Sequence, residues 1–212
     1  MTVEYRADIG ALSAPAPVID ALLAAGADAD PPEELAGTAA VQGGRLHPGL
    51  ALALGPVAAP RCVLRLERGR RVGVGWVDAR RATFVTPLAD GRRRLRSVAP
   101  EFTPEALARL NELGPRPRAE PAAPLPLTPA ELGLRIAAWP GLREHWRVVA
   151  SWGPEDGRAV EVVDTDAGLW LVLPGPDRVE LVPTTPSGVF GLLCALLPDD
   201  DELQTRHTAR LP

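Results

Sequence analysis

The chain has 212 residues, of which 46% are hydrophobic, and a net charge of −4 at pH 7. This composition predicts a folded globular protein with a buried core and excludes a disordered chain. No apolar run approaches the roughly 18 residues of a membrane span, and the first residues lack the pattern of a signal peptide. All 23 basic residues are arginine, which indicates a high-GC bacterial gene.

The first half of the chain predicts helices and strands in a fixed order. A helix is expected over 18–26 and a short helix over 46–55, each ended by a glycine. Four strands follow within 61–98, and the alternation of apolar and polar residues in the first is typical of a strand with one buried face. Thr103 and Pro104 are residue types preferred at a helix start, so a closing helix is expected there.

The middle of the chain is rich in proline. Six prolines lie between 115 and 129, a density that favours extended conformations over a helix or a sheet ladder. We therefore expect a linker over 114–128 that separates an N-terminal half, 1–113, from a C-terminal half, 129–212.

The second half repeats the order of the first. Thr128 and Glu131 form a predicted capping box, four strands are expected within 146–182, and Thr185 caps a closing helix. The stretches 74–85 and 160–172 align at an offset of 86 residues. The predicted fold is α+β. It has two similar halves, each a helix, a four-stranded antiparallel meander and a helix. A pseudo-twofold relates the halves, which pack as one domain with helices covering one sheet face.

No pattern in the sequence points to chemistry. There is no glycine-rich phosphate loop, and the three histidines share no metal-ligand spacing with each other or with the two cysteines. Cys62 and Cys194 are interpreted as buried free thiols. We expect no catalytic residue, cofactor or metal, and no enzyme. An enzyme would need a pocket that joins a cysteine or serine to His47 or His145.

Charge is distributed unevenly along the chain. Residues 61–96 hold 11 arginines and three acidic residues, a balance of +8 within a chain of −4. This segment could attract an anionic partner, but a solvated sheet face is favoured over it. Because no aromatic residue is interleaved with the arginines of 91–96, we expect no nucleic-acid partner.

A protein partner is the better expectation. The strand 169–173 is apolar on both faces, so it is either covered on both sides or adhesive on one. The partner is expected to bind an apolar strand face and part of the C-terminal half, with tryptophan anchors and with arginines that steer it electrostatically. The candidate contact residues are Trp152, Trp170, Val172, Arg92, Arg93, Arg94 and Arg96. If Trp170 is an anchor, its replacement by alanine weakens binding and leaves the melting temperature nearly unchanged.

Two passages resemble a known family. "GRLHPGLALALGPVAAPRCVLRLERG" and "VELVPTTPSGVFGLLCALLP" are similar to the helix-to-strand and strand-to-helix passages of the EspG proteins, chaperones associated with ESX (type VII) secretion. The resemblance implies a non-enzymatic, cytoplasmic chaperone of an actinobacterial cell. The sequence does not fix the oligomeric state, and a monomer is slightly favoured. The resemblance also implies a helical client, PE–PPE-like or WXG-like, that is kept soluble and presented to the secretion machinery, with no membrane contact. The alternative is an immunity protein that neutralises a secreted toxin.

Overall fold

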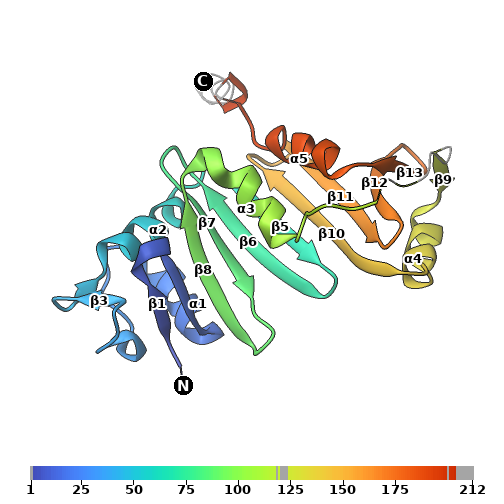
Figure 1. The fold of residues 1–212 in the computed structure, drawn as a ribbon. Coiled ribbons are helices and arrows are strands. Elements are labelled where there is room, and N and C mark those ends of the chain that lie inside the picture. The colour runs from blue at the N-terminus through green and yellow to red at the C-terminus, as the bar shows by residue number, and fades with distance from the viewer. Residues whose placement is uncertain (1, 118, 120–123, 200, 204–212) are drawn as a thin grey trace.

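The protein is built on one large antiparallel sheet. The structure, a computed structural model, describes residues 2–117, 119, 124–199 and 201–203. Within these residues, 11 strands follow the order β1-β2-β8-β7-β6-β5-β10-β11-β12-β13-β9 (Figure 1). The sheet is continuous across the middle of the molecule because β5 (Cys62–Arg68) pairs antiparallel with β10 (Leu142–Ser151). The predicted α+β class, with a large antiparallel sheet and helices, is confirmed.

The first half contains the four predicted strands. They are β5, β6 (Arg71–Val77), β7 (Ala82–Pro87) and β8 (Arg92–Val98), joined as a meander. The other elements of this half are β1 (Glu4–Arg6), η1 (Ala7–Ile9), β2 (Ala11–Pro15), α1 (Ala16–Ala25), η2 (Glu33–Leu35), β3 (Val41–Gln42), β4 (Arg45–Leu46), α2 (Pro48–Ala58), η3 (Pro100–Phe102) and α3 (Thr103–Leu110). Helix α2 continues through Gly55 and Pro56, so its predicted end was wrong. The short strands β1 and β2 were not predicted; they extend the sheet beyond β8.

The second half contains a second meander. It consists of β10, β11 (Gly157–Thr165), β12 (Gly168–Pro174) and β13 (Val179–Thr184). The other elements of this half are β9 (Leu125–Leu127), α4 (Pro129–Ala137) and α5 (Pro186–Cys194). All four predicted strands are present at close to their expected positions.

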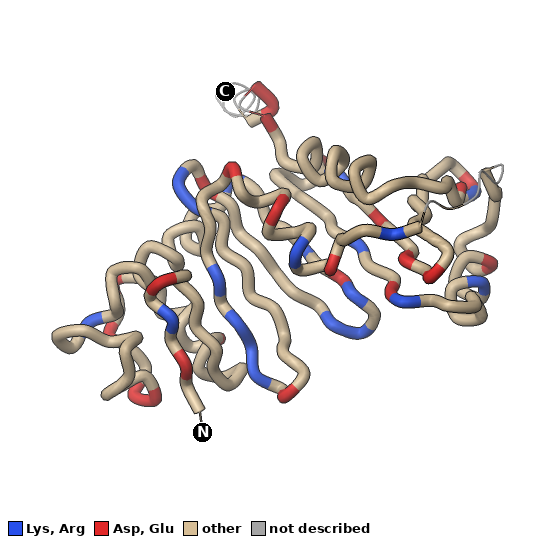
Figure 2. Tube along the Cα trace, in the orientation of Figure 1, with Lys and Arg blue, Asp and Glu red and all other residues tan. Residues whose placement is uncertain are grey.

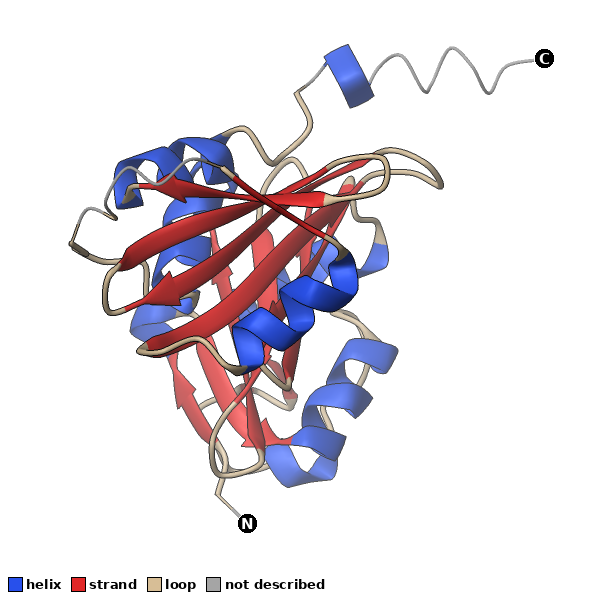
Figure 3. Ribbon diagram, turned by 90° about the vertical axis from the view of Figure 1, so that its right-hand side faces the viewer, coloured by secondary structure: helices blue, strands red, loops and turns tan. Residues whose placement is uncertain are grey.

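Helices lie on both faces of the sheet, whereas the sequence interpretation placed them on one (Figure 3). We call the side of α3 and α5 the front face and the side of α1, α2 and α4 the back face. The front face carries the largest core cluster, and the back face carries two separate clusters, one under α1 and α2 and one under α4. The physical reason is that strands such as β12 are apolar on both sides, so each side must be covered.

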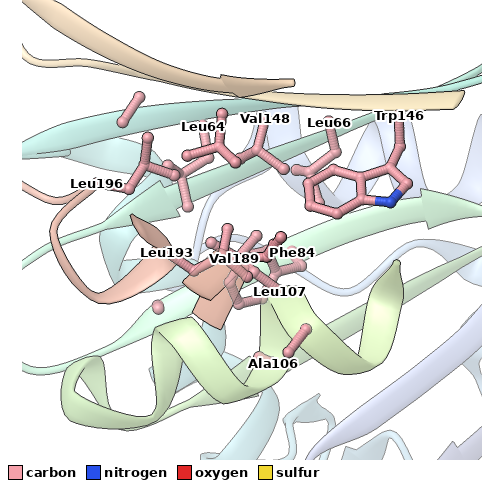
Figure 4. Packing of buried hydrophobic residues seen from close by; sticks show 14 of the residues in the cluster. Leu64, Leu66, Phe84, Ala106, Leu107, Trp146, Val148, Val189, Leu193 and Leu196 are labelled. Carbon is pink, nitrogen blue, oxygen red and sulfur yellow. The ribbon is translucent and has the colours of Figure 1, made fainter. Parts of the chain in front are cut away.

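The front core packs α3 and α5 against the middle of the sheet. Trp146 and Phe84 are its largest fully buried side chains, and Leu107 of α3 and Val189 of α5 face them (Figure 4). Gly75 makes room for this packing, because a Cβ atom there would lie 2.9 Å from the ring of Phe84. The core spans both meanders, so the two halves stabilise each other.

Local capping signals predicted the helices of the second half best. The capping box of α4 is confirmed: Thr128 Oγ1 accepts a bond from the Glu131 N–H at 3.2 Å, and Glu131 Oε2 accepts one from the Thr128 N–H at 2.7 Å. The Thr185 cap of α5 is also confirmed. The Thr103 cap was wrong, because the chain enters α3 through a 3₁₀ turn and buries Thr103 within the helix.

The proline-rich segment does contribute to the sheet. Its residues 118 and 120–123 lie outside the described part, but β9 pairs with β13 and places Pro126 opposite Glu180. An edge strand tolerates proline because one of its sides needs no ladder bonds. Earlier in the same segment, the guanidinium of Arg116 forms a two-pronged ion pair with Asp164 on β11, at 2.7–3.1 Å. The expectation that no sheet ladder forms here was therefore wrong.

Candidate functional site

Cys62 is buried, and His47 and His145 each hydrogen-bond within the fold, whereas Cys194, expected to be buried, is exposed. Burial raises the pKa of the Cys62 thiol to about 11, so this group stays protonated at neutral pH. His47 Nδ1 accepts a hydrogen bond from the Gly49 N–H and caps α2. His207 lies outside the described residues. Among the residues that are described, no three His, Cys, Asp or Glu side chains gather as metal ligands would.

The back face has an uncovered region at its centre. We define the central sheet face as the back-facing residues of β6, β5, β10 and β11: Val72, Val74, Trp76, Val63, Arg65, Glu67, His145, Arg147, Val149, Ser151, Ala159 and Glu161. The register sets these side chains in rows across the strands. One row runs Trp76, Val63, Ser151, and the next runs Val74, Arg65, Val149, Ala159. Val63 is 37% exposed and Val72 47% exposed, although both lie on strands with two neighbours.

The helices of the back face explain why its centre stays open. Helices α1 and α2 belong to the core cluster over β2, β7 and β8, and α4 belongs to the cluster over β11, β12 and β13. Trp76 marks the border with the α2 cluster, and Val163 marks the border with the α4 cluster. Between these borders the described helices leave β5 and β10 without a cover.

The central sheet face is amphipathic. The two rows that contain Trp76 and Val74 are mainly apolar, while the next row along the strands carries Glu67, Arg147 and Glu161 side by side. Glu161 Oε1 lies 2.9 Å from His145 Nε2, and Glu161 Oε2 lies 3.5 Å from Arg147 Nε. Arg65 pairs with Glu67 at 2.6 Å. An apolar strip beside a charged row is the surface that an amphipathic helix of another protein would match.

The predicted anchor Trp152 does not lie on this face. Its ring is half-buried against the front core, and the guanidinium of Arg158 lies over it at 5.3 Å. A contact role for Trp152 stays a prediction. Its ring lies on the opposite side of the sheet from the central sheet face.

The predicted adhesive strand face of β12 is covered instead. Trp170 and Val172 belong to the core cluster beneath α4, where the ring centroid of Trp170 lies 5.5 Å from that of Trp139. Val172 is only 7% exposed. Of the two alternatives that the sequence left for this strand, the structure has the covered one on this side, because α4 packs over Trp170 and Val172. A contact role for these two residues stays a prediction.

The four candidate arginines of β8 are divided between the two faces. Arg93 points to the back face and pairs with Asp20 of α1. Arg92, Arg94 and Arg96 alternate with it and point to the front face. A role in steering a partner stays a prediction for all four.

Sequence reasoning missed the central sheet face, although one signal for it was visible. The alternation in 62–67 puts Val63, Arg65 and Glu67 together on one side of β5. What the sequence does not show is that β5 pairs with β10 and that none of the described helices lies over the back of the pair. That information is in the tertiary structure alone.

The comparison with solved structures supports the fold. No known family model matches the chain, and no curated protein matches it. Among solved structures, the chain is similar to the type VII secretion system chaperone EspG5 of Mycobacterium tuberculosis, solved in complex with the PE25–PPE41 dimer. The TM-score is 0.56 at 12% identity, over 89% of this chain and 97% of that chain. The resemblance to the EspG family is therefore confirmed at the level of the fold. None of the helices in the described part is both long and apolar enough to span a membrane.

Proposed function

We propose that this protein is a non-enzymatic, cytoplasmic chaperone that binds a helical type VII secretion substrate, keeps it soluble and presents it to the secretion machinery. The observation that carries the proposal is the shared fold with EspG5, which was solved with a bound PE25–PPE41 dimer. The client of this chain is a PE–PPE-like or WXG-like helical protein.

We place client binding on the central sheet face. Val63 in its apolar rows and Val72 at the end of its charged row are both exposed, so the face offers apolar contact area, and its charged row can fix the orientation of a partner. Side chains on a sheet are held by the neighbouring strands, so the contact is preorganised and little conformational entropy is lost on binding.

The organisation of the chain fits this proposal. We interpret 1–113 and 129–212 as repeated halves that a pseudo-twofold relates and the segment 114–128 connects. The strand order supports this view, since it reads β8-β7-β6-β5 on one side of the central pair and β10-β11-β12-β13 on the other. The duplication places the first strand of each meander side by side, and the pair they form is the middle of the central sheet face.

Co-purification with candidate clients tests the proposed function. The protein is expressed together with each small helical secretion substrate encoded near its gene, and the mixture is separated by gel filtration. The proposal predicts a stable complex with one of them. If every helical substrate elutes alone and a neighbouring toxin elutes in complex instead, the protein is a neutraliser and the chaperone proposal is wrong.

A further inference from the structure

A row of arginines lies on the front face of β8. We define the arginine row as Arg92, Arg94 and Arg96. They occupy alternate positions of one strand and therefore point to the same side, about 6–7 Å apart. Leu95, between two of them, points to the back face and is fully buried under α1 and α2.

The neighbours of the arginine row are too small to cover it. Across β2, the residues opposite Arg92, Arg94 and Arg96 are Pro15, Ser13 and Ala11. Helix α3 begins near the end of β8 and runs away from it across β6 and β5 (Figure 1). Arg94 is exposed and the other two are half-buried, so the row borders solvent.

Two of the three guanidinium groups have no carboxylate partner in the described part of the chain. Arg92 Nε pairs with Asp90 at 2.7 Å. Arg94 Nε donates only to the hydroxyl of Ser13, at 3.2 Å. The Nε of Arg96 is buried and meets no acceptor among the described residues. Figure 2 shows the basic positions along β8 and an acidic position in the turn that precedes the strand.

The back face of the same strand gives a useful contrast. There, Arg93 is neutralised by Asp20 of α1. On the back face, a carboxylate of α1 thus neutralises Arg93, whereas no carboxylate of the described residues pairs with Arg94 or Arg96 on the front face. Unpaired arginines in a row are typical of a surface that receives acidic groups from a partner.

We propose that the arginine row is a docking surface for an extended acidic segment of a partner protein. Guanidinium groups bind carboxylates with two parallel hydrogen bonds. Alternate side chains of an extended peptide are also about 6–7 Å apart, so one carboxylate can meet each arginine. The row lies on the opposite side of the sheet from the central sheet face. It does not depend on the proposed client contact, and both can be occupied together.

Charge complementarity favours an acidic protein segment over nucleic acid. The positions beside the row are alanine, serine, proline and threonine, and Phe84, the one aromatic residue opposite Arg96, is 1% exposed beneath the front core. No base could stack on these side chains. The net charge of −4 also opposes the approach of a polyanion as long as a nucleic acid.

The test uses a fluorescein-labelled peptide of six Glu-Ser repeats and fluorescence anisotropy at low ionic strength. Wild-type protein is expected to bind the peptide, and the double variant Arg92→Ser/Arg94→Ser to bind it about tenfold more weakly. The control, Arg70→Ser/Arg71→Ser, removes the same charge from the exposed β5–β6 turn and is expected to bind like wild type.

Three results would overturn the proposal. The first is no binding of the peptide by wild-type protein. The second is an equal loss of affinity in both double variants, which would show that only net charge matters. The third is displacement of the peptide by a 12-nucleotide single-stranded DNA at a lower concentration than by unlabelled peptide, which would identify a nucleic-acid surface.

Discussion

The ion pair of Arg116 with Asp164 offers a sharp test of how the connecting segment stabilises the fold. The side chains are only 12% and 5% exposed, and the guanidinium makes three hydrogen bonds to the carboxylate. Replacing Arg116 by alanine leaves the Asp164 charge buried without a partner, which costs about 3–5 kcal/mol. In a chain of this size, each 1 kcal/mol lowers the melting temperature by about 2–4 °C. We therefore expect Arg116→Ala to melt about 6–20 °C below wild type.

Differential scanning calorimetry of Arg116→Ala beside a matched variant measures this effect. The control is Arg109→Ala, which breaks an exposed pair with Glu105 on α3. Such helix-surface pairs contribute about 0.3–0.5 kcal/mol, so the control is expected to melt within about 2 °C of wild type. Equal melting temperatures for the two variants would refute the reasoning, because they would show that Asp164 is solvated when Arg116 is absent.

Three further predictions follow from burial and capping. In urea denaturation, Trp170→Ala is expected to lower the free energy of unfolding by about 3 kcal/mol or more, because the Trp170 ring is part of the core beneath α4. The control is Leu134→Ala, at a position 74% exposed, and equal stability of the two variants would indicate that Trp170 is an exposed anchor. Iodoacetamide is expected to modify the exposed Cys194 in the folded protein and the buried Cys62 only in urea, and equal rates would contradict the buried thiol. The backbone N–H of Thr128 at the start of α4 lowers the pKa of Glu131. The stability that this carboxylate adds is therefore present above its ordinary pKa of about 4.3 and is lost as the pH falls through its lower folded pKa. A difference in unfolding free energy between wild type and Glu131→Ala that stays constant from pH 7 to about pH 2 would contradict this.

Local signals in the sequence predicted most of the elements. The Thr128 cap and the glycine turns act within a few residues, so their chemistry can be recognised without the rest of the chain. Strand β9 was hidden by Pro126 and the prolines before it, and Pro126 is tolerated within the strand because the strand lies at the sheet edge. The Thr103 cap failed because a tertiary constraint, the burial of Thr103 within α3, prevailed over a local preference.

The candidate site could not be predicted from the sequence, because it depends on contacts between residues that lie far apart in the chain. The apolar character of β12 was recognised, but whether Val172 is open or covered is decided by α4, which lies about 40 residues earlier in the chain. In the same way, Val63 has the pattern of any half-buried strand residue. It becomes part of a candidate binding face only because β5 meets β10 from the other half and no described helix covers the pair.

The affinity of the helical client for two matched variants tests the central claim most directly. Val63→Glu places a charge in the apolar rows of the central sheet face, and Leu134→Glu places the same charge on the exposed side of α4. With melting temperatures shown to equal that of wild type, titration calorimetry is expected to give at least about tenfold weaker binding for Val63→Glu and an unchanged affinity for Leu134→Glu. Wild-type affinity in Val63→Glu would contradict the account, because it would show that the client binds elsewhere on the protein.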